Sequence, residues 1–318
     1  VGQAGTLYKP PRKPVAFVRW AIGRLIYLRR NRAYAKFLRQ ELHLTRPYQS
    51  FAEMVDDPPK ADVYVTGSDQ TFNPQWSGAD PSYFLGFVPT ERRRTVRKIA
   101  YASSFAVSAL PPELQERYRA ALLDYDALSV REESGVALIR GLTGQEATWC
   151  CDPTLLLDRA QWAALAQKAR RRPKRPYLLV YIMAYMVNPY PQADRVVDSV
   201  ARALGLDVIY LNGRKQDLGK PHATVNKSAS PAEFVDLFLN ASFIITSSFH
   251  GAVFALHSGK PFMAFVEGDS TKDSRLRALL KRVGAERHAV PVPIPDDFQV
   301  NDLADFAPPP ETYSLALQ

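Results

Sequence analysis

The sequence predicts an α/β protein with two open, mostly parallel sheets in tandem, and three observations predict it. From Asp62 onward, short apolar runs alternate with helical patterns, as in strands joined by crossover helices. The alternation occurs twice, on either side of a basic segment that contains prolines. The chain has 318 residues, enough for two domains at roughly 150 residues each.

The first half of the chain contains one such series of strands and helices. Apolar runs bounded by turn residues predict strands over Asp62–Thr66, Ile99–Ser103, Ala127–Val130 and Ala147–Cys151. Apolar residues three and four positions apart predict helices over Pro112–Leu123 and Glu132–Arg140. The last strand is expected to be buried, with Cys150 and Cys151 as small core residues rather than reactive thiols.

The second half repeats the pattern with stronger apolar runs. Strands are predicted over Tyr177–Met183, Asp207–Leu211, Phe243–Thr246 and Phe262–Val266. Helices are predicted over Asp194–Leu204, Ala232–Asn240, Gly251–Ser258 and Ser274–Val283. Two open sheets of this kind bind ligands in the crevice outside the carboxyl ends of their strands, so the chemistry is expected between the two domains.

The two halves are separated by Lys168–Pro176, where charge and proline indicate an exposed linker. We therefore expect an N-terminal domain over residues 1–170 and a C-terminal domain over residues 171–290. Residues 291–318 are proline-rich and are expected to form an irregular tail on the surface.

Charge is concentrated in two blocks of the chain. The 41 Lys and Arg exceed the 32 Asp and Glu by nine. Residues 1–46 carry eleven bases and one acid, and residues 168–175 carry six bases and no acid. Nucleic acid, an anionic membrane surface and an acidic small substrate are all partners for such blocks, and a solvated face with an exposed linker is the alternative. No zinc-finger spacing, RNA-binding aromatic signature or regular repeat favours nucleic acid.

Several classes of protein lose support from what the sequence lacks. No apolar run approaches the roughly 20 residues that span a bilayer, so no transmembrane helix is expected. The only two cysteines are adjacent and cannot form a disulfide framework, which favours a reducing compartment and a cytoplasmic location. Motifs for dinucleotides, P-loop nucleotides and zinc proteases are missing.

The most informative segment is Phe243–Leu256, a buried strand that turns directly into a helix. Ser247 and Ser248 would place hydroxyl groups at the helix start, where free N–H groups and the positive end of the dipole attract phosphate or carboxylate. Gly251 would let a ligand approach the backbone closely. His250 would project from the first turn as an acid and base. A capping serine with a packing histidine is the alternative.

Polar groups also follow two strands of the first half. Ser68, Asp69 and Gln70 come after a glycine turn, and Asp69 would orient a sugar hydroxyl or a histidine, or cap the next segment. Arg131 leaves its strand where the crevice should open, and a guanidinium suits bidentate contact with carboxylate or phosphate. In the second half, Arg275 or Lys272 would reach the same anion.

Taken in order, these segments resemble the polysaccharide pyruvyltransferase family. They span residues 62–287, about seven tenths of the chain. Each is weak alone, and their order is specific. The matching segments are Val65–Pro74, Ile99–Phe105, Ser129–Ser134, Asp152–Leu157, Ser230–Phe234, Asn240–Phe262 and Ser274–Arg275.

The resemblance implies two Rossmann-like domains facing across a cleft, as in B-type glycosyltransferases. It also implies transfer of pyruvate from phosphoenolpyruvate onto two hydroxyls of a sugar, forming a cyclic ketal and releasing phosphate. Phosphoenolpyruvate is then a co-substrate, and neither a cofactor nor a metal is expected. The expected catalytic residues are His250, Asp69 and Arg131, and the expected substrate-binding residues are Ser247, Ser248, Gly251, Arg275, Lys272, Ser68, Gln70 and Asn73.

The start of the chain departs from the family pattern. Members usually open with a strand, a helix and a second strand before a basic helix like Ala33–Leu44, whereas here a proline-rich, basic segment precedes it. The amino-terminal sheet is therefore expected to be incomplete. Phe17–Arg32 has apolar residues on one face and many arginines around it, so it either lies on the inner membrane surface, near a lipid-linked acceptor, or packs on its own domain.

Other functions remain open at this point. A glycosyltransferase that uses sugar nucleotides would need a similar crevice and similar helix starts. A carbohydrate- or anion-binding protein without activity would retain the same scaffold. Binding to nucleic acid is not expected, and a steep salt dependence of DNA binding would revive it.

Overall fold

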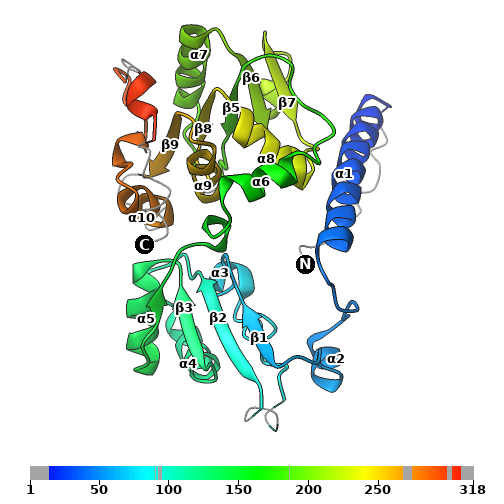
Figure 1. The fold of residues 1–318 in the computed structure, drawn as a ribbon, viewed down its shortest axis with the longest axis vertical. Coiled ribbons are helices and arrows are strands. Elements are labelled where there is room, and N and C mark those ends of the chain that lie inside the picture. The colour runs from blue at the N-terminus through cyan, green and yellow to red at the C-terminus, as the bar shows by residue number, and fades with distance from the viewer. Residues whose placement is uncertain are drawn as a thin grey trace.

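Two parallel sheets form two lobes, one above the other in Figure 1. The computed structural model describes residues 14–89, 91, 95–185, 187–267, 274–298 and 303–308. The α/β architecture with two Rossmann-like domains facing across a cleft is confirmed. The carboxyl ends of the strands in both lobes point toward the space between them, which is where polar groups from both halves of the chain meet.

The first lobe contains a four-stranded sheet in the order β1-β2-β3-β4. Its strands are β1 (Val63–Thr66), β2 (Arg97–Ser103), β3 (Ala127–Val130) and β4 (Thr148–Trp149), and its helices are α2 (Phe51–Asp56), α3 (Pro74–Ser77), α4 (Pro112–Leu123) and α5 (Glu133–Thr143). All neighbouring strands are parallel. Phe72, Phe105 and Tyr118 are fully buried in the core between this sheet and its helices.

The second lobe contains a six-stranded parallel sheet in the order β10-β9-β8-β5-β6-β7. Its strands are β5 (Tyr177–Tyr181), β6 (Asp207–Leu211), β7 (Ala223–Asn226), β8 (Phe243–Thr246), β9 (Phe262–Glu267) and β10 (Ala289–Val292). Helices α8 (Pro231–Asn240), α9 (Phe249–Ser258) and α10 (Ser274–Arg282) cover one face, and α7 (Gln192–Leu204) covers the other. Because both faces are buried, the central strands read as continuous apolar runs.

Two edge strands of the second sheet were not predicted. β7 pairs with β6 and has only one large apolar residue, Val225. β10 pairs with β9 and contains Pro291, a residue that sheets tolerate only at edges. The strand therefore includes Pro291 and Val292, at the beginning of the segment that was expected to be an irregular tail.

The fourth strand of the first sheet differs from the prediction. β4 covers only Thr148 and Trp149, both exposed, because it is the edge strand of its sheet. Cys150 and Cys151 follow it as free, half-buried cysteines rather than core residues. The apolar letters of this segment predict burial, but the edge position leaves one side of the strand without a neighbour.

The chain passes from the first lobe to the second earlier than the basic linker suggested. Leu155 and Ala166 are buried in the core of the second lobe, and α6 (Arg159–Ala166) packs against α8. Residues 168–175 then run along the surface of the second lobe. There Arg172 pairs with the buried Asp236 at 3.3 Å, and Arg175 pairs with Asp207 at 3.5 Å. The linker is therefore attached by ion pairs, although the sequence placed the boundary after residue 170.

The long helix α1 (Pro14–Glu41) lies beside the second lobe, although it precedes the first lobe in the chain. It contacts α8, and Lys168 pairs with Glu41 at its end at 2.5 Å. Residues 42–50 then lead to α2 in the first lobe (Figure 1). The structure thus shows α1 in contact with the second lobe, whereas packing on its own domain was one of the two expectations. Binding of Phe17–Arg32 to a membrane surface stays a prediction.

Among the described residues, no helix has the length and apolar character needed to cross a membrane.

Candidate active site

Charged side chains from both lobes meet between the carboxyl ends of the two sheets. Asp69 follows β1, Arg131 follows β3 and Asp152 follows β4. From the second lobe, His250 lies in the first turn of α9 after β8, and Arg275 lies in the first turn of α10. The five side chains are linked through short contacts, so residues up to 206 positions apart in the sequence form one cluster.

The turn after β1 is shaped by the backbone. Gly67 has a φ of +115°, and a Cβ at this position would lie 2.1 Å from the carbonyl oxygen of Tyr101. Asp69 itself has a φ of 68°, the left-handed region that aspartate tolerates better than most residues. The amides of Thr71 and Ser104 both donate to the Asp69 carbonyl at 2.8 Å. These bonds hold the Asp69 carboxylate toward the second lobe.

Arg131 is buried and joins the two carboxylates of the first lobe. Its Nη2 donates to Asp69 Oδ1 at 2.9 Å, and its Nη1 donates to Asp152 Oδ2. The guanidinium also lies over the ring of Phe249, 4.7 Å from its centre. Both terminal nitrogens are thus occupied by protein, so Arg131 positions the two carboxylates and does not line the pocket described below.

Asp152 is the residue that sequence reasoning missed. Its carboxylate is buried, and Oδ2 lies 3.5 Å from His250 Nε2 and 3.4 Å from Ser68 Oγ. Oδ1 accepts from the Thr154 amide at 3.0 Å. Although burial raises the pKa of this carboxyl, the bond to His250 and the charge of Arg131 outweigh it and hold the pKa well below its usual range. Asp152 is therefore an ionised carboxylate beside the imidazole.

His250 is partly open to solvent, with 35% of its side chain exposed. Its Nε2 faces Asp152, while Nδ1 has no hydrogen-bond partner among the described residues. An imidazole that is oriented by a carboxylate on one nitrogen and open on the other is the arrangement of a general acid and base. The ring is neither sealed in the interior nor far from the guanidinium groups.

A small pocket opens beside this histidine. Its volume is about 180 Å³, below the range of about 300–1,000 Å³ typical of sites for drug-sized ligands, so it suits a small molecule. It is lined by Asp69, Gln70, Tyr181, Met183, Tyr185, Val187, Ser247, Ser248, Phe249, His250, Arg275 and Leu276. The structure thus brings together six of the predicted site residues from three separate segments.

Arg275 supplies the positive charge of the pocket. Only 7% of its side chain is exposed, and its Nη1 lies 3.6 Å from Asp69 Oδ1. Burial and the neighbouring Arg131 both lower the pKa of this guanidinium, which shows how little protein charge compensates it. Its Nε is buried without a hydrogen-bond partner among the described residues. An anionic ligand would satisfy this cation.

The first turn of α9 supplies uncharged donors. Ser248 caps the helix by accepting from the Gly251 amide at 3.3 Å, and Ser247 Oγ accepts from the Met183 amide at 2.8 Å. The amides of Phe249 and His250 have no partner within the helix, because the first turn has none to offer. The Ser247 hydroxyl and these amides are therefore placed to donate at the positive end of the helix dipole, while the Ser248 side chain is bonded to Tyr181.

Gly251 has a different role from the one expected. A Cβ at this position would lie 2.2 Å from Thr246 Oγ1, and Thr246 in turn donates to the Tyr181 carbonyl at 2.8 Å. Glycine is needed here because the helix packs directly on the end of β8. The close approach is made by a protein side chain, whereas a ligand was expected.

The remaining predicted residues lie around the pocket or outside the described part. Ser68 donates to the Ala102 carbonyl at 2.9 Å and contacts Asp152, so it supports the cluster from behind. Asn73 is buried and caps α3 by accepting from the Gln75 amide at 2.9 Å. Its amide also donates to Gln70, so Asn73 acts through Gln70 rather than on a ligand. Lys272 lies outside the described residues.

Within the described residues, no group of three or more His, Cys, Asp or Glu side chains is arranged to hold a metal ion. The carboxylates of the cluster, Asp69 and Asp152, are both engaged by Arg131.

Several solved structures have a similar fold, at low sequence identity. UDP-GlcNAc 2-epimerase from Methanocaldococcus jannaschii is 14% identical, with a TM-score of 0.53 over 82% of this chain and 79% of that chain. A putative UDP-N-acetylglucosamine 2-epimerase from Listeria monocytogenes is 10% identical, with a TM-score of 0.50 over 87% of this chain and 77% of that one. A glycotransferase of kitacinnamycin is 16% identical, with a TM-score of 0.42 over 83% and 72%. No curated protein sequence matches the chain significantly.

The fold defines a protein with two Rossmann-like domains of the B-type glycosyltransferase architecture, and the candidate site lies between them. The family follows from the sequence. The model of the polysaccharide pyruvyl transferase family matches residues 8–269, most of the chain. The chain belongs to this family and is a transferase of polysaccharide synthesis.

Proposed function

We propose that the protein transfers pyruvate from phosphoenolpyruvate onto two hydroxyls of a sugar in a polysaccharide or its precursor. The product is a cyclic ketal, and phosphate is released. The observation that carries this proposal is the contact between His250 and Asp152 beside a small pocket that holds the poorly compensated Arg275. Family membership makes the pyruvyl group the expected cargo.

The pocket offers a compact anion several donors. Phosphoenolpyruvate carries a phosphate and a carboxylate. Arg275 would bind one of these groups, and the start of α9 with Ser247 and Ser248 would bind the second. Asp69 and Asp152 are both paired with Arg131, so Arg275 is left to meet the charge of the donor. A highly charged donor is therefore bound best when His250 carries a proton, and the reaction needs that proton.

The chemistry can be written with atoms in balance. One sugar hydroxyl forms a C–O bond to C2 of phosphoenolpyruvate, and the methylene carbon C3 takes a proton from His250 to become a methyl group. The hydroxyl proton returns to His250. A second hydroxyl of the same sugar then attacks C2 as the C–O bond to phosphate breaks, and its proton leaves with phosphate. Arg275 and the amides of α9 would stabilise the departing phosphate.

The two carboxylates have different tasks in this scheme. Asp152 holds the imidazole through Nε2, so that Nδ1 faces the pocket. Asp69 lines the pocket with 59% of its side chain exposed, so it can accept a hydrogen bond from the acceptor hydroxyl. Arg131 keeps both carboxylates in place. The half-buried free cysteines Cys150 and Cys151 support a reducing location, and we propose the cytoplasm.

The direct test is phosphate release from phosphoenolpyruvate in the presence of candidate sugar acceptors. We expect release that depends on both substrates, with a ketal product seen by mass spectrometry as a gain of one pyruvate per sugar minus water. Release of a nucleotide from a sugar nucleotide, without use of phosphoenolpyruvate, would instead identify a glycosyltransferase. Binding of sugars with no turnover of either donor would leave a carbohydrate-binding protein.

His250→Gln is expected to lower kcat about 10²- to 10⁴-fold, because it removes the group that moves the proton. The matched control is His222→Gln, which changes a histidine whose side chain is 75% exposed, far from the cluster. Equal rates in both variants would remove His250 from the mechanism.

A further inference from the structure

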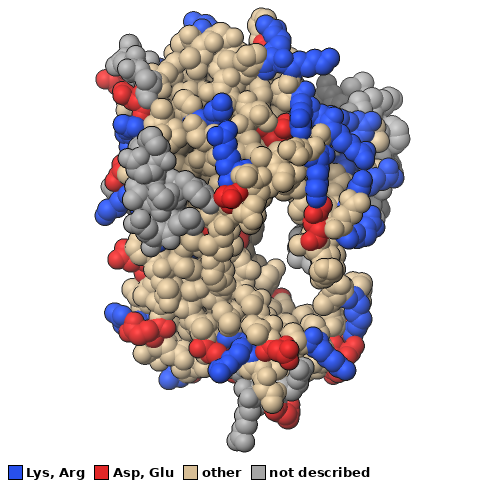
Figure 2. All heavy atoms as spheres, viewed as in Figure 1, with Lys and Arg blue, Asp and Glu red and all other residues tan. Residues whose placement is uncertain are grey.

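A second, larger hollow lies between α1 and the second lobe. Its volume is about 680 Å³. In Figure 2, Lys and Arg side chains gather over α1 and the adjoining edge of the upper lobe. The pocket is lined by Arg29, Arg32, Ala33, Lys36, Phe37, Gln40, Glu41, Leu165, Lys168, Arg170, Arg171, Ser228, Ser230, Pro231, Ala232 and Glu233. We call it the basic pocket.

The lining of the basic pocket is strongly positive. It contains six bases and two acids, a difference of 6 − 2 = 4 positive charges. Both acids are engaged: Glu41 pairs with Lys168, and Glu233 accepts from the Ser230 amide at 2.8 Å in the capping box of α8. Among the described residues, Arg29, Arg32, Lys36, Arg170 and Arg171 make no ion pair with a carboxylate. Like charges this close repel one another unless an anion lies among them.

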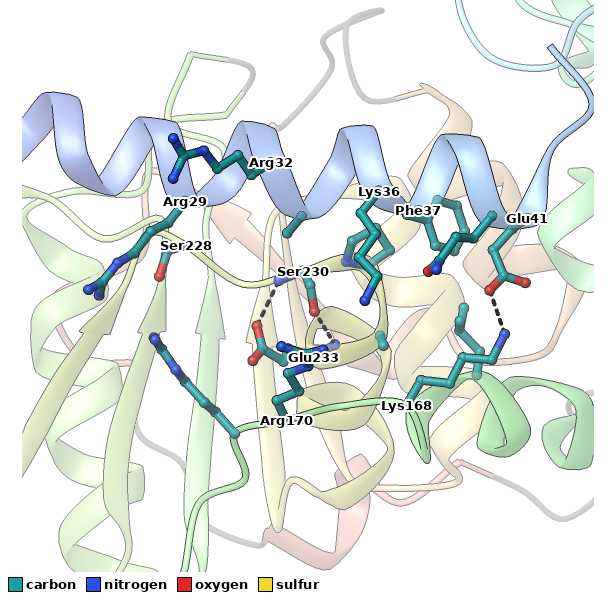
Figure 3. Close-up of a pocket in the computed structure, with 16 residues that line it drawn as sticks. Arg29, Arg32, Lys36, Phe37, Glu41, Lys168, Arg170, Ser228, Ser230 and Glu233 are labelled. Carbon is teal, nitrogen blue, oxygen red and sulfur yellow. Dashed lines mark hydrogen bonds and ion pairs between the residues drawn. The ribbon is translucent and has the colours of Figure 1, made fainter.

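Two ion pairs hold the walls of the basic pocket in place. Lys168 and Glu41 join the linker to the end of α1. Arg172, next in the chain after Arg171, pairs with Asp236 of α8, whose side chain is only 3% exposed. In Figure 3, Arg29 and Lys36 extend from α1 toward the loop that carries Ser228 and Ser230. Bases from two distant segments therefore face a common space.

Helix α1 connects the basic pocket with the active-site pocket. Arg30 and Tyr34 act electrostatically on the Tyr181 hydroxyl, and Tyr181 lines the active-site pocket. Burial, with smaller contributions from Tyr185 and Tyr34, raises the pKa of Tyr181 to about 12, although Arg30 acts to lower it. Arg29, Ala33 and Phe37, on the same helix, line the basic pocket. Residues of one helix therefore lie near both pockets.

The charge and the size indicate what the basic pocket would bind. A single phosphate group is short and would contact bases on only part of this lining. A diphosphate spans more than one base and matches arginines on opposite walls, where bidentate bonds form. A volume of about 680 Å³ also exceeds the needs of a small anion and lies within the range of ligand pockets, about 300–1,000 Å³.

We infer that the basic pocket binds the diphosphate group of a diphosphate-linked sugar. That this ligand is also the acceptor of the transfer rests on the proposed function. The sugar would extend past α1 toward Tyr181 and the active-site pocket. A concave pocket favours such a discrete group over the flat surface of an anionic membrane.

Isothermal titration with inorganic pyrophosphate tests the site without phosphoenolpyruvate. The double variant Arg29→Gln, Arg170→Gln removes one base from each wall. The matched control Arg39→Gln, Lys174→Gln removes one base from α1 and one from the linker, and neither residue lines the pocket. We expect about tenfold or more weaker binding in the first variant, since bonds to charged groups are lost, and wild-type affinity in the control. Equal affinities in both, or loss only on Arg275→Gln, would overturn the inference.

Three ligands distinguish the source of the anion. UDP-N-acetylglucosamine represents a soluble diphosphate sugar, and farnesyl diphosphate represents a lipid diphosphate. If one of these two ligands binds and the double variant weakens its binding, the result supports the site and shows which kind of diphosphate it takes. Sedimentation with phosphatidylglycerol vesicles is the third arm. Vesicle binding that the pocket variant weakens, without any binding of the diphosphates, would make the face a membrane surface and overturn the inference.

The inference and the proposed function fail separately. Pyrophosphate binding requires no turnover, so a protein that does not consume phosphoenolpyruvate can still retain it. Where turnover is found, the pocket variant is expected to raise KM for a diphosphate-linked acceptor about tenfold and to leave KM for phosphoenolpyruvate unchanged. An unchanged KM for that acceptor would contradict its placement in the basic pocket.

Discussion

The two pockets hold their positive charges in opposite ways. In the active site, Arg131 and Arg275 are buried, and Asp69 and Asp152 lie against them within ion-pair distance. In the basic pocket, five bases face solvent without a carboxylate among the described residues. Buried charges need partners, because desolvation is costly, whereas exposed ones are stabilised by water. In the active site, the ion pairs hold the side chains in a fixed geometry. In the basic pocket, the bases remain free to bind an anionic ligand.

The largest effect is expected when the buried arrangement loses its central cation. Arg131→Gln should lower the free energy of unfolding by about 3–5 kcal/mol, because it leaves the buried carboxylate of Asp152 without its guanidinium partner. Urea unfolding measures this change. The control is Arg140→Gln, which breaks an exposed pair with Glu146 and should cost no more than about 1 kcal/mol. Similar losses in both variants would show that burial of Arg131 does not matter.

Acid should weaken the active-site cluster more than the basic pocket. The pKa of Asp152 and that of Asp69 are lowered in the folded protein, so each contributes stability above the unfolded value of about 3.9 and loses it as pH falls toward the folded value. Unfolding free energy should therefore drop between about pH 5 and pH 3. Asp152→Asn should make this drop smaller. An unchanged slope would mean that folding does not lower the pKa of Asp152.

Added salt should weaken ligand binding in the basic pocket more than ligand binding in the active site. Raising NaCl from about 0.05 to about 0.5 M shortens the screening length to a few ångströms, and exposed charges are screened most. The affinity of the basic pocket for pyrophosphate should fall severalfold, while KM for phosphoenolpyruvate changes less. Titrations and steady-state rates across the same salt series check this. A stronger salt effect on KM would reverse the comparison.

The smallest effect is expected at the exposed pair that joins the linker to α1. Lys168→Gln should change the free energy of unfolding by no more than about 1 kcal/mol, because both side chains remain solvated. Urea unfolding of this variant beside wild type is sufficient. A loss of several kcal/mol would indicate that docking of α1 is part of the folding unit.

Much of the fold followed from local patterns. Central strands such as β5 and β8 are continuous apolar runs, and their ends are marked by polar residues. The edge strands β7 and β10 escaped because an edge needs fewer apolar residues and tolerates proline. The docking of α1 on the second lobe also escaped, since no local pattern records which surface a long helix will meet.

The site residues were predicted from their positions after strands. Asp152 was missed for a simple reason. Asp69, Arg131 and His250 were found because each follows a predicted strand. Asp152 follows β4 in the same way, but its proline neighbour suggested turn chemistry alone. Arg131 and Gly251 were assigned to a ligand, whereas burial gives both of them protein partners. The sequence shows which residue types gather at the carboxyl edge of a sheet. It cannot show which of them are buried by other parts of the protein.

Asp152 lies where the chain leaves one lobe for the other, and its two strongest neighbours lie on opposite sides. Arg131 keeps the carboxylate with the first lobe, while the imidazole 3.5 Å away travels with α9. A hinge opening would therefore pull the acid–base pair apart, together with the contact between Arg275 and Asp69 that also joins the lobes. Proton transfer would be confined to the shut enzyme, and an open one would be protected from hydrolysing its donor.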